Sequence, residues 1–462
     1  MNDTLLRGPI LNPRSNGTVD FWPDGALRSG PNGRLVFAGP WAELDAQGGT
    51  LSCPVVQSEG LILPPLLDCH THVSQFCVRG RFDEGVPDDA PEGRLLAGLK
   101  RNIFPEEARM VRSRFSSLAV AGFAQDTLSQ GVVGGASYMT VHPRATRLAL
   151  AGLSEWWSVG LVLMNQNCPS FLRTQEDALA QNVAALASEL GRRLIVTDRF
   201  AVSTDTPLRR RGVRAARQHG LRMQTHLNEQ RAEKAWVEGT LYPGYSSYTD
   251  VYARDGLLGC EAILAHCIHM RPDEWDLVAD AGAAVAHCPT SNTLLGSGIM
   301  PLETVLEKKI PYALGTDVGA SSTTSMLAEM AQFLRVHAGR SSRATPQEAL
   351  FRATLAPAQI LDLEGELGSF EIGKPLSYIE TRCDEENLAG KTADAVIAHS
   401  LLEMPNDASP ELEAAHALLA AGGLPPGEHL RLLTQQVQET AGRMEAKVQQ
   451  VVLRGETVWQ RG

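Results

Sequence analysis

The sequence predicts an α/β protein, with a (β/α)8 TIM-like barrel and a small β-sandwich domain built from both chain ends. Between about residues 65 and 365, short apolar runs alternate with amphipathic stretches, which is typical of βα units around a parallel sheet. Some eight such units over about 300 residues fit a closed barrel better than an open doubly wound sheet. The first sixty residues are instead β-like pieces broken by Gly and Pro, which favours a small sheet or sandwich.

Three segments are expected along the chain. Residues 1–62 form the N-terminal part of the sandwich, with β-like pieces at 35–40 and 60–64. Residues 63–367 form the barrel. Residues 368–462 complete the sandwich and add a helical insertion at 400–448, for which solvated surface is the simplest interpretation. Residues Val451–Trp459 are predicted as a strand, a turn and a strand that join the N-terminal sheet.

The barrel strands are predicted from short apolar runs, and amphipathic helices are expected between them. No G-x-G-x-x-G follows an early strand and no G-x-x-x-x-G-K-[ST] occurs, so neither nucleotide fingerprint supports the open-sheet alternative. Helices are expected at 175–190 and 207–218. The predicted strands after the first lie at 131–136, 160–164, 194–197, 222–226, 262–266, 283–287 and 311–314.

Composition narrows the class of partner. The 42 Lys and Arg against 53 Asp and Glu give a net charge of −11, which argues against a nucleic-acid or an anionic membrane partner. No apolar run reaches the roughly eighteen residues that a spanning helix needs, and the first thirty residues do not resemble a secretory signal. The eight cysteines contain no C-x-x-C pair. They are expected to be reduced thiols in a cytoplasmic enzyme that acts on a small molecule.

Five metal-binding side chains end or follow apolar runs. His70 and His72 follow the first run, His226 and His266 end two later runs, and Asp317 follows another. Alternate residues of an extended chain face the same way, and active sites of parallel barrels lie at the C-terminal strand ends. Imidazole and carboxylate suit Zn²⁺, and three or four such ligands with one open position make a catalytic site. A set of satisfied core histidines is the alternative, but it does not explain why the strand ends coincide.

One metal ion is expected rather than two. No lysine occurs between Lys100 and Lys234, which excludes a carbamylated lysine on a middle strand bridging two ions. The other zinc-deaminase plan needs H-x-E with P-C-x-x-C, whereas residues 287–289 read His-Cys-Pro and lack a second cysteine. His269 is expected to be structural or to support the ligands. The histidines in helical or polar contexts are expected on the surface or in the core: His219, His337, His399, His416 and His429.

Glu229 is the candidate for proton transfer. It follows His226 by three residues, so its carboxylate can reach a water molecule that the metal activates without binding the metal itself. A carboxylate in that position can take the proton and pass it to a ring nitrogen. The alternative is a Glu at a helix N-terminus that only complements the helix dipole.

With these residues, the chain resembles the amidohydrolase superfamily and, within it, the guanine deaminases, over about residues 60–375. Metal ligands alone recur in triazine hydrolases and pterin deaminases, so the Gln, the Arg-Phe pair and the tyrosine-rich segment are the part specific for a purine. The segments that carry the resemblance are Leu67–Gln75, Thr197–Phe200, Thr225–Glu229, Leu241–Tyr252, His287–Asn292 and Gly315–Val318.

The resemblance implies zinc-dependent hydrolytic deamination of guanine to xanthine and ammonia by a homodimer. It implies one Zn²⁺ per chain, with Fe²⁺ as the alternative ion. Catalysis is assigned to Glu229, Asp317 and His266, with His266 hydrogen-bonding the developing tetrahedral centre. The implied metal ligands are His70, His72, His226 and Asp317, and the implied substrate-binding residues are Gln75, Arg199, Phe200 and His226.

The three base-binding side chains suit guanine on chemical grounds. Phe200 can stack on the ring, Arg199 offers fixed donors for the ring carbonyl, and Gln75 has both a donor and an acceptor. Two other functions stay open: hydrolysis of another aminated ring (pterin, triazine or cytosine-like), and a non-catalytic barrel that serves as a scaffold. The segment 78–100, expected as a loop over the site, and the tail from 400 depart from the family. They leave substrate breadth and oligomer contacts open.

Overall fold

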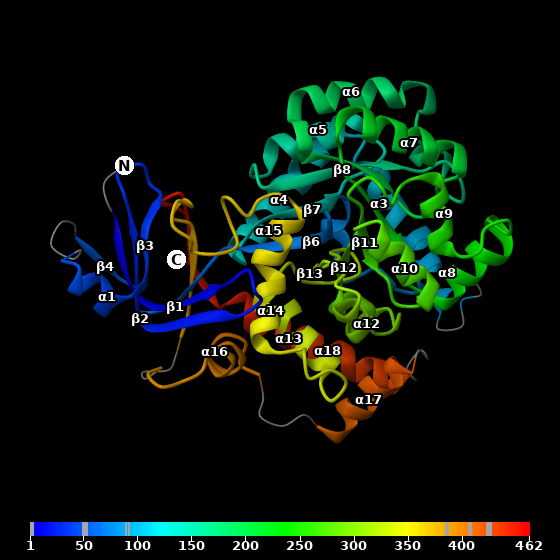
Figure 1. The fold of residues 1–462 in the computed structure, drawn as a ribbon. Helices are drawn as coiled ribbons and strands as arrows, with labels where there is room; N and C mark the ends of the chain where they lie inside the picture. The colour runs from blue at the N-terminus through cyan, green and yellow to red at the C-terminus, as the bar shows by residue number, and fades with distance from the viewer. Residues whose placement is uncertain are drawn as a thin grey trace.

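A barrel of strands ringed by helices lies beside a sheet that contains both chain ends (Figure 1). The structure is a computed structural model, and it describes residues 4–48, 54–87, 90, 93–383, 388–404, 409–421 and 427–462. Within these ranges no helix has both the length and the apolar character needed to cross a membrane.

Eight parallel strands form the barrel in chain order, β6 to β13. Every predicted strand segment overlaps one of them, so the barrel prediction is confirmed. Most are buried along their whole length, as expected for a parallel sheet covered on both faces. The bounds are β6 Leu66–His72, β7 Val132–Tyr138, β8 Trp157–Leu163, β9 Leu194–Asp198, β10 Met223–Leu227, β11 Ile263–His266, β12 Ala284–His287 and β13 Tyr312–Leu314.

The first and last strands meet just beyond β13. The backbone N–H of Asp317 donates to the carbonyl oxygen of His70 (2.8 Å). Gly315 makes this approach feasible, because a Cβ at that position would lie 2.8 Å from the His70 Cβ. This contact between β6 and the residues after β13, called the seam below, therefore brings the end of β13 directly against the two histidines of β6.

Helices cover the outside of the barrel. The helices expected at 175–190 and 207–218 are present as α6 and α7, and α7 begins where the Asp205 side chain accepts from the N–H of Leu208 (2.9 Å). The helices from α4 onward are α4 Ser113–Ser129, α5 Pro143–Gly152, α6 Leu179–Leu190, α7 Thr206–His219, α8 Arg231–Trp236, α9 Tyr248–Asp255, α10 Pro272–Asp280, α11 Pro289–Leu294, α12 Leu302–Glu307, α13 Met326–His337, α14 Pro346–Ala353 and α15 Leu355–Ile360.

Both chain ends build the second sheet, as the sequence predicts. Its order is β16-β15-β14-β5-β1-β2-β3, and β4 also pairs with β1, so the sheet branches at β1. A short helix α1 (Trp41–Ala46) follows β3. The exact limits 1–62, 63–367 and 368–462 stay predictions. The strands are β1 Leu5–Pro13, β2 Val19–Ser29, β3 Leu35–Pro40, β4 Val55–Gln57, β5 Leu61–Leu63, β14 Tyr378–Thr381, β15 Val448–Leu453 and β16 Glu456–Gln460.

The insertion at 400–448 is helical, with α17 (Pro410–Ala420) and α18 (Gly427–Glu445) following the short α16 (Ala393–Ala395) and a π-helical turn, Val396–Leu401. It is not simply solvated surface. Helix α18 contacts α11 and α13 and buries Leu433, Val437 and Met444. Residues 405–408 and 422–426 of the predicted segment lie outside the described residues.

Candidate metal centre and active site

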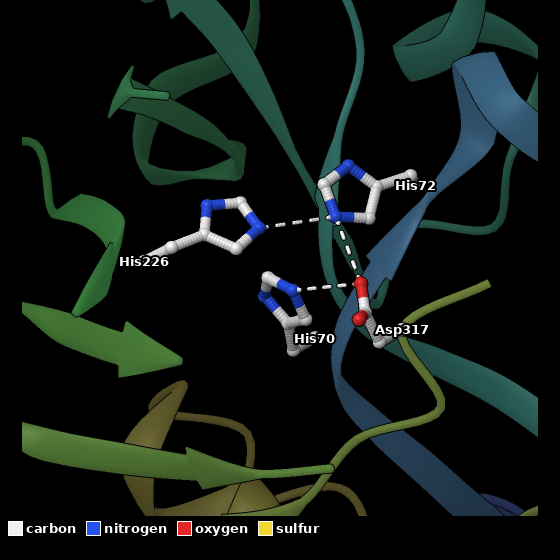
Figure 2. Close-up of side chains that lie close together, drawn as sticks. All are labelled: His70, His72, His226 and Asp317. Atoms are coloured by element: carbon white, nitrogen blue, oxygen red, sulfur yellow. Dashed lines mark hydrogen bonds and ion pairs between the residues drawn. The ribbon is translucent and has the colours of Figure 1, made fainter. Parts of the chain in front are cut away.

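Four side chains meet at the C-terminal end of the barrel, and Figure 2 shows them pointing toward one another. Their possible ligand atoms all lie within 4.8 Å of one another. The Oδ1 of Asp317 lies 3.2 Å from the Nε2 of His70 and 3.0 Å from the Nε2 of His72, and the Nε2 atoms of His72 and His226 are 3.3 Å apart. The strand ends therefore bring together the four residues that the resemblance assigns to the metal.

The chemistry of these donors fits a divalent metal ion. His226 donates its Nδ1–H to the carbonyl oxygen of Arg199 (2.6 Å), so its Nε2 lone pair is directed to the cluster. Burial lowers the pKa of His72 to about 3 and that of His226 well below its usual value, which keeps both imidazoles neutral. Neutral imidazoles and one carboxylate are a donor set typical of zinc and related ions.

The backbone of Asp317 adopts an unfavourable conformation, and a hydrogen bond from Ser291 orients its side chain. Its φ is +52°, and His266 and Asn228, also at strand ends, have φ values of +72° and +52°. Such left-handed conformations in non-glycine residues are often found at functional sites. The Ser291 hydroxyl donates to the Oδ2 of Asp317 (2.5 Å), which leaves Oδ1 facing the histidines.

Glu229 lies beside the cluster and is buried. Its Oε1 accepts from the Ser297 hydroxyl (3.1 Å), and its Oε2 is 3.6 Å from the Nε2 of His266. Burial is the largest influence on Glu229 and raises its pKa to about 7. His266 is turned by Asn292, whose Oδ1 lies 2.9 Å from the His266 Nδ1. A carboxyl group whose pKa lies near neutrality can accept a proton and return it.

A small cavity opens beside these groups. Phe82, Leu95 and Leu99 of the segment 78–100 line it, as expected. The segment is not only a loop, because residues Gly93–Gly98 form helix α2; residues 88–89 and 91–92 are outside the described part. Seven predicted site residues lie on its walls. The lining residues are His72, Gln75, Phe82, Leu95, Leu99, Arg199, Phe200, His226, Glu229, Leu295, Asp317 and Ala320.

Sequence reasoning missed Glu107, on α3 (Phe104–Arg109). Its buried Oε1 accepts from the Nη1 of Arg199 (2.5 Å) and from the Nε2 of Gln75 (3.1 Å). The carboxylate therefore joins two of the predicted substrate-binding residues. It stands 92 residues from Arg199 and belongs to no motif, so no sequence signal could have linked the pair.

The tyrosine-rich segment supports the site from behind. The Tyr252 hydroxyl donates to the carbonyl oxygen of His226 (3.0 Å), and the Tyr248 hydroxyl donates to Glu233 (2.9 Å). Glu233 in turn accepts from the N–H of Glu229 (3.0 Å). The walls formed by described residues contain no tyrosine. These rings hold the strand end and the Glu229 turn in place.

Three further histidines make structural contacts. His269 approaches the carbonyl oxygen of Ser297 through its Nε2 (2.8 Å), and His287 pairs with buried His337 at 3.1 Å between their Nε2 atoms. None of the three belongs to the metal cluster.

A parallel barrel with three imidazoles and one carboxylate at its strand ends, beside a buried acid, defines a class of metal-dependent hydrolases. Residues 61–379 match the amidohydrolase family, and the chain belongs to that family.

The chain is similar to guanine deaminases in sequence. It is 31% identical to guanine deaminase of Escherichia coli over 69% of this chain and 72% of the relative. It is also 31% identical to probable guanine deaminase of Deinococcus radiodurans, over 86% and 90%. The fold matches the solved E. coli guanine deaminase (TM-score 0.78, 24% identity, 100% of both chains). It also matches guanine deaminase from C. acetobutylicum with bound guanine (TM-score 0.76, 21% identity, 99% of this chain and 100% of that one).

Proposed function

We propose that this protein hydrolyses guanine to xanthine and ammonia with one Zn²⁺ per chain, Fe²⁺ being the alternative ion. The observation that carries the proposal is that one cavity is lined by Glu229, by three of the four cluster residues, and by the Gln75–Arg199–Phe200 group. The similarity to guanine deaminases supports the choice of ring.

The ion would be held by His70, His72, His226 and Asp317. When bound, it supplies Lewis acidity that lowers the pKa of water to about 7 and so makes a nucleophile available near neutral pH. The residues of the chain then have separate tasks. Glu229 accepts the proton of the attacking water and delivers it to the ring nitrogen next to the reacting carbon. His266 hydrogen-bonds the developing tetrahedral centre, and Asp317 assists removal of the proton.

Recognition of the base falls to the remaining walls. Phe200 lies 6.3 Å from His226 between ring centroids, which sets an apolar face next to the reacting centre. Arg199 would donate to the ring carbonyl and Gln75 would bind the mixed polar edge. Water adds to the amino-bearing carbon and the amino group leaves as ammonia, so guanine and water give xanthine and ammonia.

The test is loss of guanine absorbance with coupled ammonia detection, with and without a chelator. Glu229→Gln should keep the metal yet lose about 10²–10⁴-fold in turnover. Glu189→Gln, a half-exposed acid paired with Arg147 on the outer helices, is the control. Near-normal turnover by Glu229→Gln would remove that residue from the mechanism.

A panel of aminated pterins, triazines and cytosine tests the choice of ring. Faster turnover of any of these than of guanine would replace the purine assignment. A complete lack of chelator-sensitive turnover across the panel would instead favour a non-catalytic scaffold. Arg199→Ala should mainly raise KM for guanine, and unchanged kinetics would contradict its role.

We further propose that the enzyme acts in purine catabolism in the cytoplasm as a homodimer. The free thiols among the described cysteines support the cytoplasmic location, and the family resemblance supports purine catabolism and the homodimer. Light scattering of the purified chain should give twice the monomer mass, and a monomer would contradict the dimer.

A further inference from the structure

We infer that Glu107 is a positioning residue that fixes how Gln75 and Arg199 face the ring, and that it thereby makes the cavity select a neutral ring over an anionic one. The inference rests on the proposed function, in which Gln75 and Arg199 hold the base.

Glu107 lies behind the cavity wall. Its side chain is 1% exposed and that of Arg199 is 3% exposed, and their 2.5 Å contact is an ion pair removed from solvent. Gln75 and Arg199 line the cavity, whereas Glu107 is not among the described residues that line it. Its effect on a substrate therefore passes through these two side chains.

The carboxylate determines which way the Gln75 amide points. An ionised carboxylate only accepts hydrogen bonds, so the amide must turn its NH₂ toward Glu107, as the 3.1 Å contact shows. The amide oxygen then faces away, and no group in the described ranges donates to it. The cavity is thus offered a hydrogen-bond acceptor, which suits an N–H group on the edge of a ring.

Gly319 provides the space for that amide oxygen. Its φ is +124°, and a Cβ at this position would lie 2.0 Å from the Oε1 of Gln75. The three atoms nearest to that Cβ all belong to Gln75, so a side chain here would displace the amide. A substitution at Gly319 therefore perturbs the orientation of Gln75 while both residues of the Glu107–Arg199 ion pair are kept.

The same carboxylate balances the charge of Arg199. Only Nη1 of the guanidinium is used by Glu107, and the described residues offer no acceptor for its Nε and Nη2. The pair can donate hydrogen bonds to a ring carbonyl while carrying no net charge. A neutral lactam ring can accept these hydrogen bonds without adding a charge, whereas an anionic ring would be buried beside a carboxylate.

The test measures, by calorimetry and by inhibition of guanine turnover, the binding of two purines that carry no amino group to be hydrolysed. Hypoxanthine is a neutral lactam, and urate is an anion at pH 7. The wild-type protein should prefer hypoxanthine. Glu107→Gln removes the negative charge at nearly constant shape. It should weaken the binding of hypoxanthine and raise KM for guanine, each by at least about tenfold, and it should strengthen the binding of urate. The effect on kcat should be smaller.

The matched control is Glu106→Gln, the same change one residue away on a carboxylate that pairs with Arg109 (2.7 Å). It should leave the ratio of urate to hypoxanthine affinity at the wild-type value. An unchanged ratio in Glu107→Gln, or weakening of both ligands alike, would overturn the inference, because a purely structural role lowers both affinities. Since calorimetry needs no turnover, a wild-type protein inactive on guanine would refute the proposed function while the ratio still tests Glu107.

Should Glu107→Gln not fold, Gly319→Ala decides the matter. A rise in KM for guanine of at least about tenfold, with metal content unchanged, supports the assigned Gln75 orientation. An unchanged KM overturns it.

Discussion

Asp68 on β6 accepts a hydrogen bond from the backbone N–H of Thr316 after β13 (3.0 Å), across 248 residues of sequence. The Thr316 hydroxyl also donates to Asp68, and the N–H of His70 donates to the same carboxylate (3.1 Å). One buried side chain thus fastens the first strand to the last, directly between two of the metal-cluster residues.

Replacing Asp68 should loosen this seam. Asp68→Ala leaves buried donors of Thr316 and His70 unpaired, at a cost of about 1–3 kcal/mol for each donor. Asp68→Asn keeps an acceptor for the two N–H groups and should cost much less. Denaturant unfolding measures both changes, with exposed Asp276→Asn as the surface control. Equal stability of the Ala and Asn variants would contradict the role of the carboxylate.

Gly315→Ala should force β6 and β13 apart. Its Cβ would lie 2.8 Å from both the Cβ and the backbone nitrogen of His70, and such overpacking costs about 1–3 kcal/mol. Thermal unfolding and metal content should fall together, since His70 belongs to the cluster. Gly365→Ala is the matched control, because its Cβ would meet nothing within 4 Å. Wild-type metal content in Gly315→Ala would show that the seam does not set the ligand geometry.

The pH dependence of turnover should follow Glu229. Burial raises its pKa to about 7, whereas the hydrogen bond from Ser297 favours the charged form. A bound cation also favours the charged form, so the acidic limb of kcat/KM should lie at or below about pH 7. Ser297→Ala removes the stabilising donor and should move that limb to higher pH. Ser188→Ala, on an exposed helix face, should not move it. A limb that stays in place or moves to lower pH would exclude Glu229 as the titrating base.

Removal of metal should lower stability as well as turnover. An ion present at about 100 times its Kd stabilises the folded state by about 2.7 kcal/mol, so a chelator should lower the midpoint of thermal unfolding. Reloading with Zn²⁺, or with Fe²⁺ under anaerobic conditions, shows which ion restores activity. His269→Ala lies outside the cluster and should keep the response to the chelator. An unfolding midpoint that ignores the chelator in the wild type would argue against a bound ion.

Much of this architecture could be predicted from local pattern. Barrel strands of three to seven residues alternate with helices, and the period of each pattern depends only on neighbours along the chain. The position of a histidine at the end of such a run is equally local. The barrel and five candidate ligands at its strand ends could therefore be anticipated, whereas the choice of four of them was implied by the family resemblance. The sheet built from both ends followed from its strand–turn–strand tail.

Other features depend on contacts that no local pattern records. The family resemblance groups the tyrosines near 248 with the substrate-specific residues, yet they face the back of the site and support His226 and Glu229. Arg209 lies on a helix that was predicted correctly, but its fully buried pairing with Asp198 and Asp255 gave no sequence signal.

The barrel and five candidate metal ligands at its strand ends were determined by the sequence alone, because periodicity and spacing along the backbone express them. Only the tertiary structure decided that Glu107 joins Gln75 to Arg199 and that Asp68 fastens β6 to the end of β13. A hydrogen bond between buried groups depends on a separation of about 3 Å in space. That separation is set by the packing of the whole barrel and not by distance along the chain.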